Sequence, residues 1–375
     1  MYYHIFTDRD ATIYEKYLER NTGIDQILQL TKIASGSLLN GFYQSNTYNS
    51  RILVDFKSQL TEVSNSIVAG DIPIPGSGSD SSSFFLTMKA IDAHSLPISY
   101  SLVAYPISQS WENGTGRFDD IPEDKTGVSW KYRKNSIEWA SGSQIMDGGA
   151  GGTTEGGGGT WHTGSYATAS FNYESPDVTM NITDIVIKWF NGTYENNGLI
   201  IKRPTSDEQD SQTFGSLGFF SQDTNTVYIP KIEIGWSDVD LTGTGSHTEL
   251  SDDNITVYFK NLKPTYKEKD QVKIRLCGRK TYPTKTYTTS SFYSVIERLP
   301  TSSYFSVKDA SSEETIIPFN DTYTQISCDT TGNYFKMRFN TFFPERTYRF
   351  LIKTKEDGGD TVRIYDNGYY FKVIR

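Results

Sequence analysis

Short runs in which apolar and polar residues alternate make up most of the chain, and turn residues separate these runs. Successive side chains of a strand point to opposite faces, so alternation with a period of two is typical of strands buried on one face. The sequence between the first three runs is rich in Ser, Asn and Tyr and predicts loops. The strands predicted in this part are 11–17, 27–33, 50–56, 84–90, 98–105, 167–171, 199–202, 216–221 and 227–234.

Two segments of the same part favour short helices. The first covers residues 58–69 and is ended by a stretch that contains two prolines and the Gly/Ser-rich tract 76–83. The second lies within residues 178–190, where a strand leads into an amphipathic helix with Thr183 or Asp184 as its N-cap.

The C-terminal part repeats the pattern of short strands and turns. Alternation is clear over 256–260 and 272–277, and the last strand covers 369–374. Pro344 stands four residues before Tyr348. This spacing permits a tyrosine corner, in which the phenol hydroxyl donates a hydrogen bond to the backbone upstream.

The segment 238–252 is polar and rich in Gly, Ser and Thr, and the charge balance changes sign there. The chain has 36 Lys and Arg and 45 Asp and Glu, of which residues 250–375 carry 20 and 15. That leaves 16 and 30 for residues 1–249, a net charge of −14 before the boundary and +5 after it. We therefore expect two domains, 1–240 and 250–375.

Composition favours an all-β protein. The chain has only 11 Ala and 18 Leu against 25 Tyr and 21 Phe. Aromatic and β-branched residues suit pleated sheets, whereas Ala and Leu fill ordinary helices, so helical bundles and large α/β enzymes are disfavoured. The spacing of the strands and turns predicts β-sandwiches.

Several partner classes are not expected. No apolar run reaches the ~18 residues that span a membrane, and the first residues lack the pattern of a signal peptide. The acidic first part argues against nucleic-acid binding, because phosphate contact needs a basic surface. The basic last part has no clustered stripe and suits an acidic protein partner better.

No catalytic motif stands out. The nucleophile elbow, HExxH, CxxC and P-loop patterns are all missing, and we expect no cofactor. The glycine tract 147–160 has no following Lys, so we expect a loop that is mobile or ordered by a neighbouring subunit, not a phosphate cradle. His4, His94, His162 and His247 lie far apart and are expected at the surface or in loops.

Two acidic clusters and two cysteines complete the candidate chemistry. Asp119, Asp120, Glu123 and Asp124 could supply oxygens to Ca²⁺, as could Asp238 and Asp240, but the spacing is not that of an EF-hand and a solvated turn is favoured. Two cysteines are too few for a disulfide scaffold, and Cys277 and Cys328 are expected to be reduced core residues.

All tryptophans fall in the first part, and they can be interpreted in two ways. Exposed Trp faces stack on sugars, whereas buried ones fill a sandwich core or an interface; the second interpretation is favoured because large aromatic residues are usually buried. The six are Trp111, Trp130, Trp139, Trp161, Trp189 and Trp236.

The segment 108–117, SQSWENGTGR, followed by the GVSW segment 127–130, resembles the DNRLRE-type jelly-roll module, a β-sandwich similar to carbohydrate-binding modules. The resemblance covers roughly residues 8–236, and the glycine tract departs from it. It implies a jelly-roll sandwich over 1–240, followed by an immunoglobulin-like sandwich over 250–375. The other segments that carry it, in order, are 10–14, 50–56, 182–189, 197–202 and 230–234.

The two-part layout, with the segments 263–266, 282–287 and 316–320 in its second part, resembles structural proteins of tailed-bacteriophage virions. The resemblance implies a non-enzymatic protein located in the virion, in the tail, neck, collar or fibre, that forms a homo-oligomer and contacts other virion proteins. The alternative is a carbohydrate-binding module for host glycan, which predicts coplanar exposed aromatic rings. A glycan-degrading enzyme is a third hypothesis, and it requires a carboxylate pair in a cleft.

Overall fold

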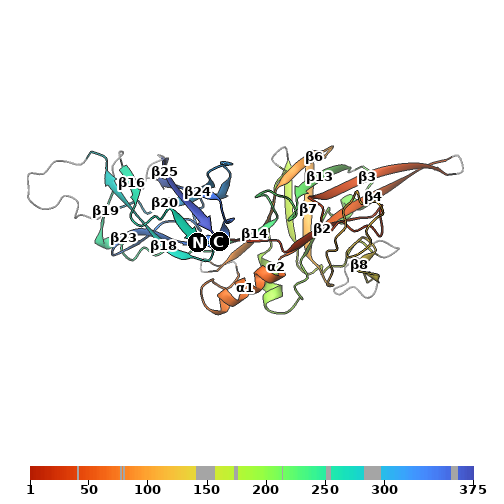
Figure 1. Ribbon diagram of the computed structural model, residues 1–375, viewed down its shortest axis with the longest axis horizontal. Coiled ribbons are helices and arrows are strands. Elements are labelled where there is room, and N and C mark those ends of the chain that lie inside the picture. Colours follow the sequence, from red (N-terminus) through yellow and green to blue (C-terminus); the bar gives the residue numbers. More distant parts are fainter. Residues whose placement is uncertain are drawn as a thin grey trace, which may run out of the picture. The chain divides into compact units, whose positions relative to one another are not determined.

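The computed structural model describes residues 1–39, 42–76, 78, 81–140, 157–172, 176–212, 214–250, 255–282, 297–355 and 362–375. Strands make up 46% and helices 10% of the structure, which confirms the all-β class. The chain divides into two compact units (Figure 1). The N-terminal unit comprises Ile5–Ser77 and Ser82–Glu233, and the C-terminal unit comprises Met1–His4, Gly78–Ser81 and Ile234–Arg375.

The N-terminal unit is built on two main sheets. The larger has the strand order β10-β7-β12-β4-β3-β13-β6, with β2 also paired to β4. The smaller has the order β1-β14-β5-β11, of which residues 2–4 of β1 and 234–235 of β14 are counted with the C-terminal unit. A short hairpin pairs β8 with β9. The strands are β1 (Tyr2–Phe6), β2 (Arg9–Tyr14), β3 (Ile27–Leu39), β4 (Phe42–Asp55), β5 (Ser83–Met88), β6 (Ala90–His94), β7 (Ser99–Pro106), β8 (Tyr132–Lys134), β9 (Ile137–Glu138), β10 (Ala167–Asn172), β11 (Val178–Asn181), β12 (Leu199–Lys202), β13 (Gly215–Phe220) and β14 (Lys231–Gly235).

Both predicted helices are present, as α1 (Lys57–Val68) and α2 (Thr183–Phe190), and a short third helix, α3 (Thr205–Gln209), was not predicted. The predicted cap of α2 was wrong. The N-cap position is Ile182, and the side chain of Asn181 accepts hydrogen bonds from the amide and the hydroxyl of Thr183 at 3.0 and 2.7 Å. The Thr183 hydroxyl instead accepts the Phe84 amide, which ties α2 to β5.

The loop predicted between 33 and 50 was also wrong. In the structure β3 and β4 continue through this segment and pair without a register shift from Lys32↔Asn49 to Leu39↔Phe42. Ile33 and Ala34, which point to opposite faces of β3, are both exposed. A strand segment that is exposed on both faces needs no apolar alternation, so the periodicity that reveals half-buried strands is missing where β3 passes Ile33 and Ala34.

Four tryptophans and the apolar residues of β2, β4 and β12 form a core cluster in the N-terminal unit. Trp111 donates its indole N–H to the Asn197 carbonyl at 2.9 Å, and Trp139 donates to the Ser129 carbonyl at 3.0 Å. The loops that carry these residues are therefore held to the sheet by both packing and hydrogen bonds. The buried members of the cluster are Ala11, Ile13, Leu53, Ile107, Trp111, Val128, Trp130, Trp139, Trp161 and Ile200.

The C-terminal unit is a β-sandwich, with strand orders β16-β18-β23-β22 and β17-β25-β24-β20-β21. One aromatic core joins the two sheets: Phe335 of β23 stacks on Phe305 of β20, with ring centroids 4.2 Å apart. The strands are β15 (Thr248–Glu249), β16 (Ile255–Phe259), β17 (Thr265–Lys267), β18 (Gln271–Lys280), β19 (Glu297–Arg298), β20 (Ser303–Asp309), β21 (Thr315–Ile317), β22 (Ser327–Asp329), β23 (Gly332–Arg338), β24 (Thr347–Lys355) and β25 (Val362–Ile374).

The tyrosine corner is confirmed. Tyr348, at the start of β24, donates its hydroxyl to the carbonyl of Phe343 at 3.1 Å. The Tyr348 ring is buried, and burial raises the pKa of its phenol well above the usual value.

The predicted domain boundary needs a correction at both ends of the first domain. Residues 1–4 and 234–240 belong to the C-terminal unit. The reason is a set of contacts around the amino terminus: the Met1 ammonium donates to the Trp236 carbonyl and lies 2.7 Å from an Asp238 carboxylate oxygen. Trp236 also lies beside the guanidinium of Arg338, 5.9 Å from its ring centre.

Candidate functional site

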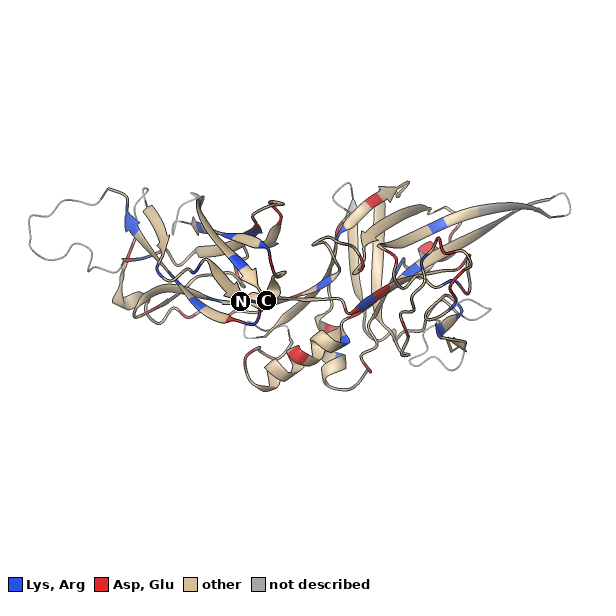
Figure 2. Cartoon of the chain, viewed as in Figure 1, with Lys and Arg blue, Asp and Glu red and all other residues tan. Residues whose placement is uncertain are grey.

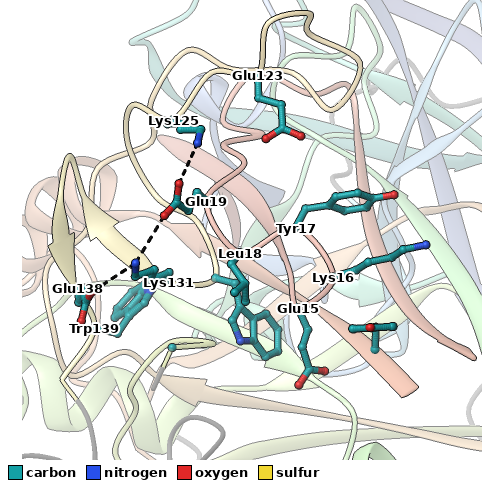
Figure 3. Close-up of a pocket in the computed structure, with 13 residues that line it drawn as sticks. Glu15, Lys16, Tyr17, Leu18, Glu19, Glu123, Lys125, Lys131, Glu138 and Trp139 are labelled. Atoms are coloured by element: carbon teal, nitrogen blue, oxygen red, sulfur yellow. Dashed lines mark hydrogen bonds and ion pairs between the residues drawn. The ribbon is translucent and has the colours of Figure 1, made fainter. Parts of the chain in front are cut away.

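A groove of about 860 Å³ opens on the N-terminal unit (Figure 3). Its walls come from the segment after β2, from the loop and hairpin around β8 and β9, and from single residues of β4 and the glycine tract. The segment after β2 and the loop and hairpin around β8 and β9 are more than a hundred residues apart, so the sequence alone did not reveal the groove. The lining residues are Glu15, Lys16, Tyr17, Leu18, Glu19, Tyr48, Glu123, Lys125, Trp130, Lys131, Glu138, Trp139 and Gly157.

Alternating charges run along one wall of the groove (Figure 3). Glu19 lies 2.9 Å from the Lys125 ammonium and 3.5 Å from that of Lys131, which in turn lies 3.6 Å from Glu138. The hydrogen bond from Lys125 holds the pKa of Glu19 below its usual value. A glycosidase needs a carboxylic acid whose pKa is raised so that it can donate a proton. The pKa of Glu19 is lowered, which is the opposite of what a proton-donating acid needs.

The other carboxylates of the groove are engaged in fixing the backbone. Glu15 accepts hydrogen bonds from the amide and the side chain of Asn49 at 2.8 and 3.0 Å. Glu123 forms an ion pair with Arg20. These contacts hold together the segments that form the walls.

The tryptophans are buried, as predicted. Trp130 is 0% and Trp139 3% exposed, so they form the inner wall of the groove and offer no open ring face. The other four are between 1% and 7% exposed. None of the six tryptophans therefore supplies the exposed Trp or Tyr rings that the glycan-binding alternative predicts.

A cluster of buried charges holds α3 to the large sheet. Glu208 of α3 accepts two hydrogen bonds from Arg51, at 3.0 and 2.8 Å, and lies 2.7 Å from the Lys202 ammonium. Burial alone would raise the pKa of Glu208, but Arg51 and Lys202 outweigh it and the pKa is lowered. The buried Lys32 ammonium donates to the Asp210 carboxylate at 2.7 Å. Lys32, Arg51 and Lys202 stand in predicted strands, and nothing in the sequence indicated that their charged side chains would be buried together with partners from 208–210.

The end of the glycine tract corrects another expectation. Residues 141–156 lie outside the described residues, but Gly157, Gly158 and Gly159 are buried against their own chain. Gly158 donates its amide to the Trp130 carbonyl at 2.6 Å and accepts a hydrogen bond from Arg51 at 2.5 Å. Its φ of +78° and the nearby indole favour glycine at this position.

A second cavity of about 510 Å³ contains part of the predicted acidic cluster. Burial raises the pKa of Asp25 to about 6, and the charges of Asp119 and Asp120 add to this shift. Asp120 and Asp124 accept backbone amides at 2.7 and 2.8 Å, as residues of a turn do. The described residues contain no group of three or more His, Cys, Asp or Glu placed to hold a metal ion.

The carboxylates of the second predicted cluster have protein partners. Asp238 pairs with the Met1 ammonium, and Asp240 accepts hydrogen bonds from Thr242 and Tyr334. We therefore treat both clusters as structural.

One of the four histidines, His4, is not where it was expected, because it lies within β1, whereas His162 lies in a loop as expected. His4 and His162 are buried, 1% and 5% exposed. The imidazole of His162 stacks on Tyr194 with ring centroids 4.0 Å apart, so it serves as a flat core residue. Cys277 and Cys328 are free and buried, in agreement with the prediction.

The last feature is a projecting hairpin, which we call the arm and define as residues 33–39 of β3 and 42–48 of β4 (Figure 1). The strand β13 pairs with β3 only from Ile27 to Lys32, and β2 pairs with β4 only from Ser50 to Asp55. Beyond these points the described strands leave both outer edges of the arm without a neighbour. Seven residues at ~3.3 Å each give the arm a length of about 23 Å.

A scan against protein-family models finds none that matches the chain, and a search of curated proteins finds no significant match. None of the helices within the described residues has the length and apolar character needed to cross a bilayer. Within each unit, basic and acidic residues are interspersed along the strands (Figure 2).

Proposed function

We propose that the chain is a non-enzymatic structural protein of a tailed-phage virion, a component of the tail, neck, collar or fibre that assembles with other virion subunits. The observation that carries the proposal is the arm. It is anchored at its base by buried charges, and among the described strands none pairs with either of its outer edges. Such edges pair readily with strands of another chain, and monomeric proteins usually protect them.

The domain types expected from the resemblance support the same proposal. In the C-terminal unit, β16, β18, β23 and β22 correspond to strands A, B, E and D of an immunoglobulin fold, and β20, β24 and β25 to strands C, F and G. The tyrosine corner at the start of β24 occupies the position usual for that fold. We propose an immunoglobulin-like domain here and a jelly-roll-like domain in the N-terminal unit. Both present rigid faces suited to symmetric assembly.

A second candidate function is contact with host glycan, and the groove is the observation in its favour. Its paired charges and the partly exposed rings of Tyr17 and Tyr48 could bind the hydroxyls and the apolar faces of sugars. Saccharide-array binding that is lost on Lys131→Ala and kept on Lys134→Ala, outside the groove, would favour this function over the structural one.

The structural proposal is tested by asking whether the chain is part of the particle. The protein carrying a C-terminal peptide tag is produced in cells that make the virions, and the particles are purified through a density gradient. We expect the tag to sediment with intact particles and to be detected on them by immunogold electron microscopy. A tag that stays entirely in the soluble fraction while particles form normally would contradict the proposal.

A further inference from the structure

One sheet face of the C-terminal unit gathers cations, although the unit as a whole carries charges of both signs. Five Lys and Arg side chains point outward from β18, β23 and the end of β16, and they alternate with residues of the core. The sequence shows no such cluster, because these strands are separated along the chain and apolar residues stand between the cations. We call this surface the basic face, and its cations are Lys260, Lys273, Arg275, Arg279 and Lys336.

Carboxylates balance only part of the charge of the basic face. Asp329 lies 2.6 Å from the Lys273 ammonium and 2.8 Å from the Arg275 guanidinium. Asp240 accepts a hydrogen bond from the neighbouring Tyr334. The five cations less these two carboxylates leave an excess of three positive charges. Within the described residues no carboxylate pairs with the remaining cations, which are Lys260, Arg279 and Lys336.

An apolar spot lies between the cations of the basic face. Tyr258 of β16 stands opposite Cys277 of β18, and its side chain is 39% exposed. Lys260 follows two residues after Tyr258, and Arg279 follows two residues after Cys277, so both cations border the tyrosine on the same face. An apolar centre with a polar rim is the usual layout of a protein interface.

The N-terminal unit carries a loop with the same layout and the opposite charge, which we call the acidic loop and define as residues 119–124. Ile121 at its centre is 96% exposed, more than any other large apolar side chain within the described residues. Asp120 and Asp124 accept backbone amides at 2.7 and 2.8 Å, which hold the loop in one shape. With the cations at its two ends included, the segment 117–125 has a net charge of −2. The carboxylates around Ile121 are Asp119, Asp120, Glu123 and Asp124.

We propose that the acidic loop of one copy docks on the basic face of a second copy, with Ile121 against Tyr258. The inference rests on the assembly role proposed above and names the partner. In this arrangement the carboxylates around Ile121 meet the cations around Tyr258, so groups of opposite charge enclose the apolar contact. The loop belongs to the N-terminal unit and the face to the C-terminal unit. Two docked copies therefore keep one free loop and one free face, and copies add head to tail until a ring closes or a longer array forms.

The match between the two surfaces favours a second copy over another anionic partner. Each chain supplies one loop and one face, and both have an apolar centre inside a charged rim, with opposite signs. A nucleic acid or an anionic membrane would match the charge of the face, but it would leave Ile121 exposed and would repel the acidic loop. A single loop buries little area, so each contact should be weak, and closure of a ring would strengthen it.

Sedimentation velocity of the full chain, from micromolar to submillimolar concentration, measures self-association. The loop variant combines Asp119→Lys with Ile121→Ser, and the face variant combines Lys260→Glu with Arg279→Glu. The charged side chains among these four form no ion pair or hydrogen bond within the described residues. Both variants should therefore keep the wild-type thermal midpoint.

A matched control makes the same change of charge elsewhere on the C-terminal unit. It combines Lys308→Glu with Lys355→Glu, on β20 and β24 of the other sheet. Neither lysine forms an ion pair within the described residues. The control separates loss of the basic face from a change in net charge.

We expect wild type and the control to associate, and added salt to weaken the association, because salt screens exposed charges. The loop variant and the face variant should each dissociate at least about tenfold more readily than wild type. Mixed in equal amounts, the two should form a dimer that grows no further, since one supplies an intact face and the other an intact loop.

A wild type that stays monomeric would overturn the proposal, and its retention on immobilised poly-glutamate would then indicate an acidic segment of another protein as the occupant. Association that is kept by either variant, lost in the control or not restored by mixing would overturn it as well. None of these outcomes decides whether the tagged chain sediments with particles, so the two proposals fail separately.

Discussion

Arg51 and Glu208 lie 157 residues apart in the sequence and form a buried ion pair with two hydrogen bonds, at 3.0 and 2.8 Å. The pair joins β4, just below the arm, to α3. The side chains are 6% and 5% exposed, and the guanidinium lies 4.7 Å from the ring centre of Trp130. Water therefore does little to screen these charges, and each depends on its partner for compensation.

Glu208→Gln should lower the free energy of unfolding of the N-terminal unit by about 3–5 kcal/mol, because it leaves the Arg51 and Lys202 cations buried without their anion. Urea titration followed by tryptophan fluorescence measures the change. The matched control is Lys125→Gln, which breaks a pair that is 58% exposed on the lysine side and should cost far less stability, because water screens exposed charges. Equal costs for the two variants would contradict this reasoning.

The stability of the N-terminal unit should also fall as the pH rises through the range in which Asp10 ionises. Burial raises the pKa of Asp10 to about 7 from 3.8. A carboxylic acid whose pKa is higher in the folded than in the unfolded state stabilises the fold while it is protonated. At Asp10 this stabilisation is complete below about pH 4 and is lost as the pH rises to about 7.

Over that range the free energy of unfolding of wild type should fall more steeply with pH than that of Asp10→Asn, which cannot ionise at this position. The two slopes should differ by up to about 1.4 kcal/mol per pH unit. Chemical denaturation at several pH values provides the measurement. A parallel pH dependence for wild type and Asp10→Asn would show that Asp10 titrates normally in the folded protein.

The strands with one buried face and the two longer helices could be predicted because their periodicity is local. For example, the prediction at 84–90 corresponds to β5 (Ser83–Met88), where Phe84 and Leu86 are buried and alternate with less buried residues. The tyrosine corner was predictable for a similar reason, since Pro344 and Tyr348 are close in the sequence. Local patterns of this kind do not need knowledge of the tertiary fold.

The arm and the charge cluster could not be predicted, for opposite physical reasons. The arm is rich in Ser, Asn and Tyr and has no regular alternation of apolar and polar residues. Lys32 and Arg51 look like surface residues in the sequence, because a charged side chain is rarely buried without a partner. Their partners lie more than 150 residues away, so the sequence does not show them. The groove likewise depends on two segments, 15–19 and 123–139, that are more than a hundred residues apart.

Tyr348→Phe should destabilise the C-terminal unit by about 0.5–1.5 kcal/mol. The variant removes only the hydroxyl that donates to the Phe343 carbonyl and leaves the aromatic packing in place. Calorimetry of the full chain should show a lower midpoint for the transition of this unit. Tyr282→Phe removes a hydroxyl from a residue that is 82% exposed and should have no effect.

Trp111→Ala should cost about 3–5 kcal/mol in the N-terminal unit, since it removes a fully buried ring that donates to Asn197 and lies beneath the Arg9 guanidinium. The exposed aromatic residue Tyr166 supplies the control, and Tyr166→Ala should change stability by less than about 0.5 kcal/mol. If Trp111→Ala kept the wild-type melting temperature and lost binding to a glycan, the carbohydrate-binding alternative would replace the structural proposal.

Two glycines with nearly the same backbone conformation allow the packing around Arg51 to be tested without changing a charge. Gly158 has φ +78° and Gly192 has φ +74°, so an alanine at either position pays the same left-handed strain, about 1–2 kcal/mol. A Cβ at Gly192 would meet nothing within 4 Å, whereas at Gly158 it would lie 2.5 Å from an Arg51 nitrogen and 2.8 Å from the Trp130 ring.

Gly158→Ala should therefore lower the free energy of unfolding by about 1–3 kcal/mol more than Gly192→Ala does, which is the usual range for overpacking a rigid interior. Urea titration of the two variants side by side gives this difference directly. The neighbours of Gly158 are held firmly, because the guanidinium is bonded to Glu208 and the indole is buried. Similar losses at the two positions would mean that Arg51 and Trp130 can move aside, and that the base of the arm is less rigid than its hydrogen bonds imply.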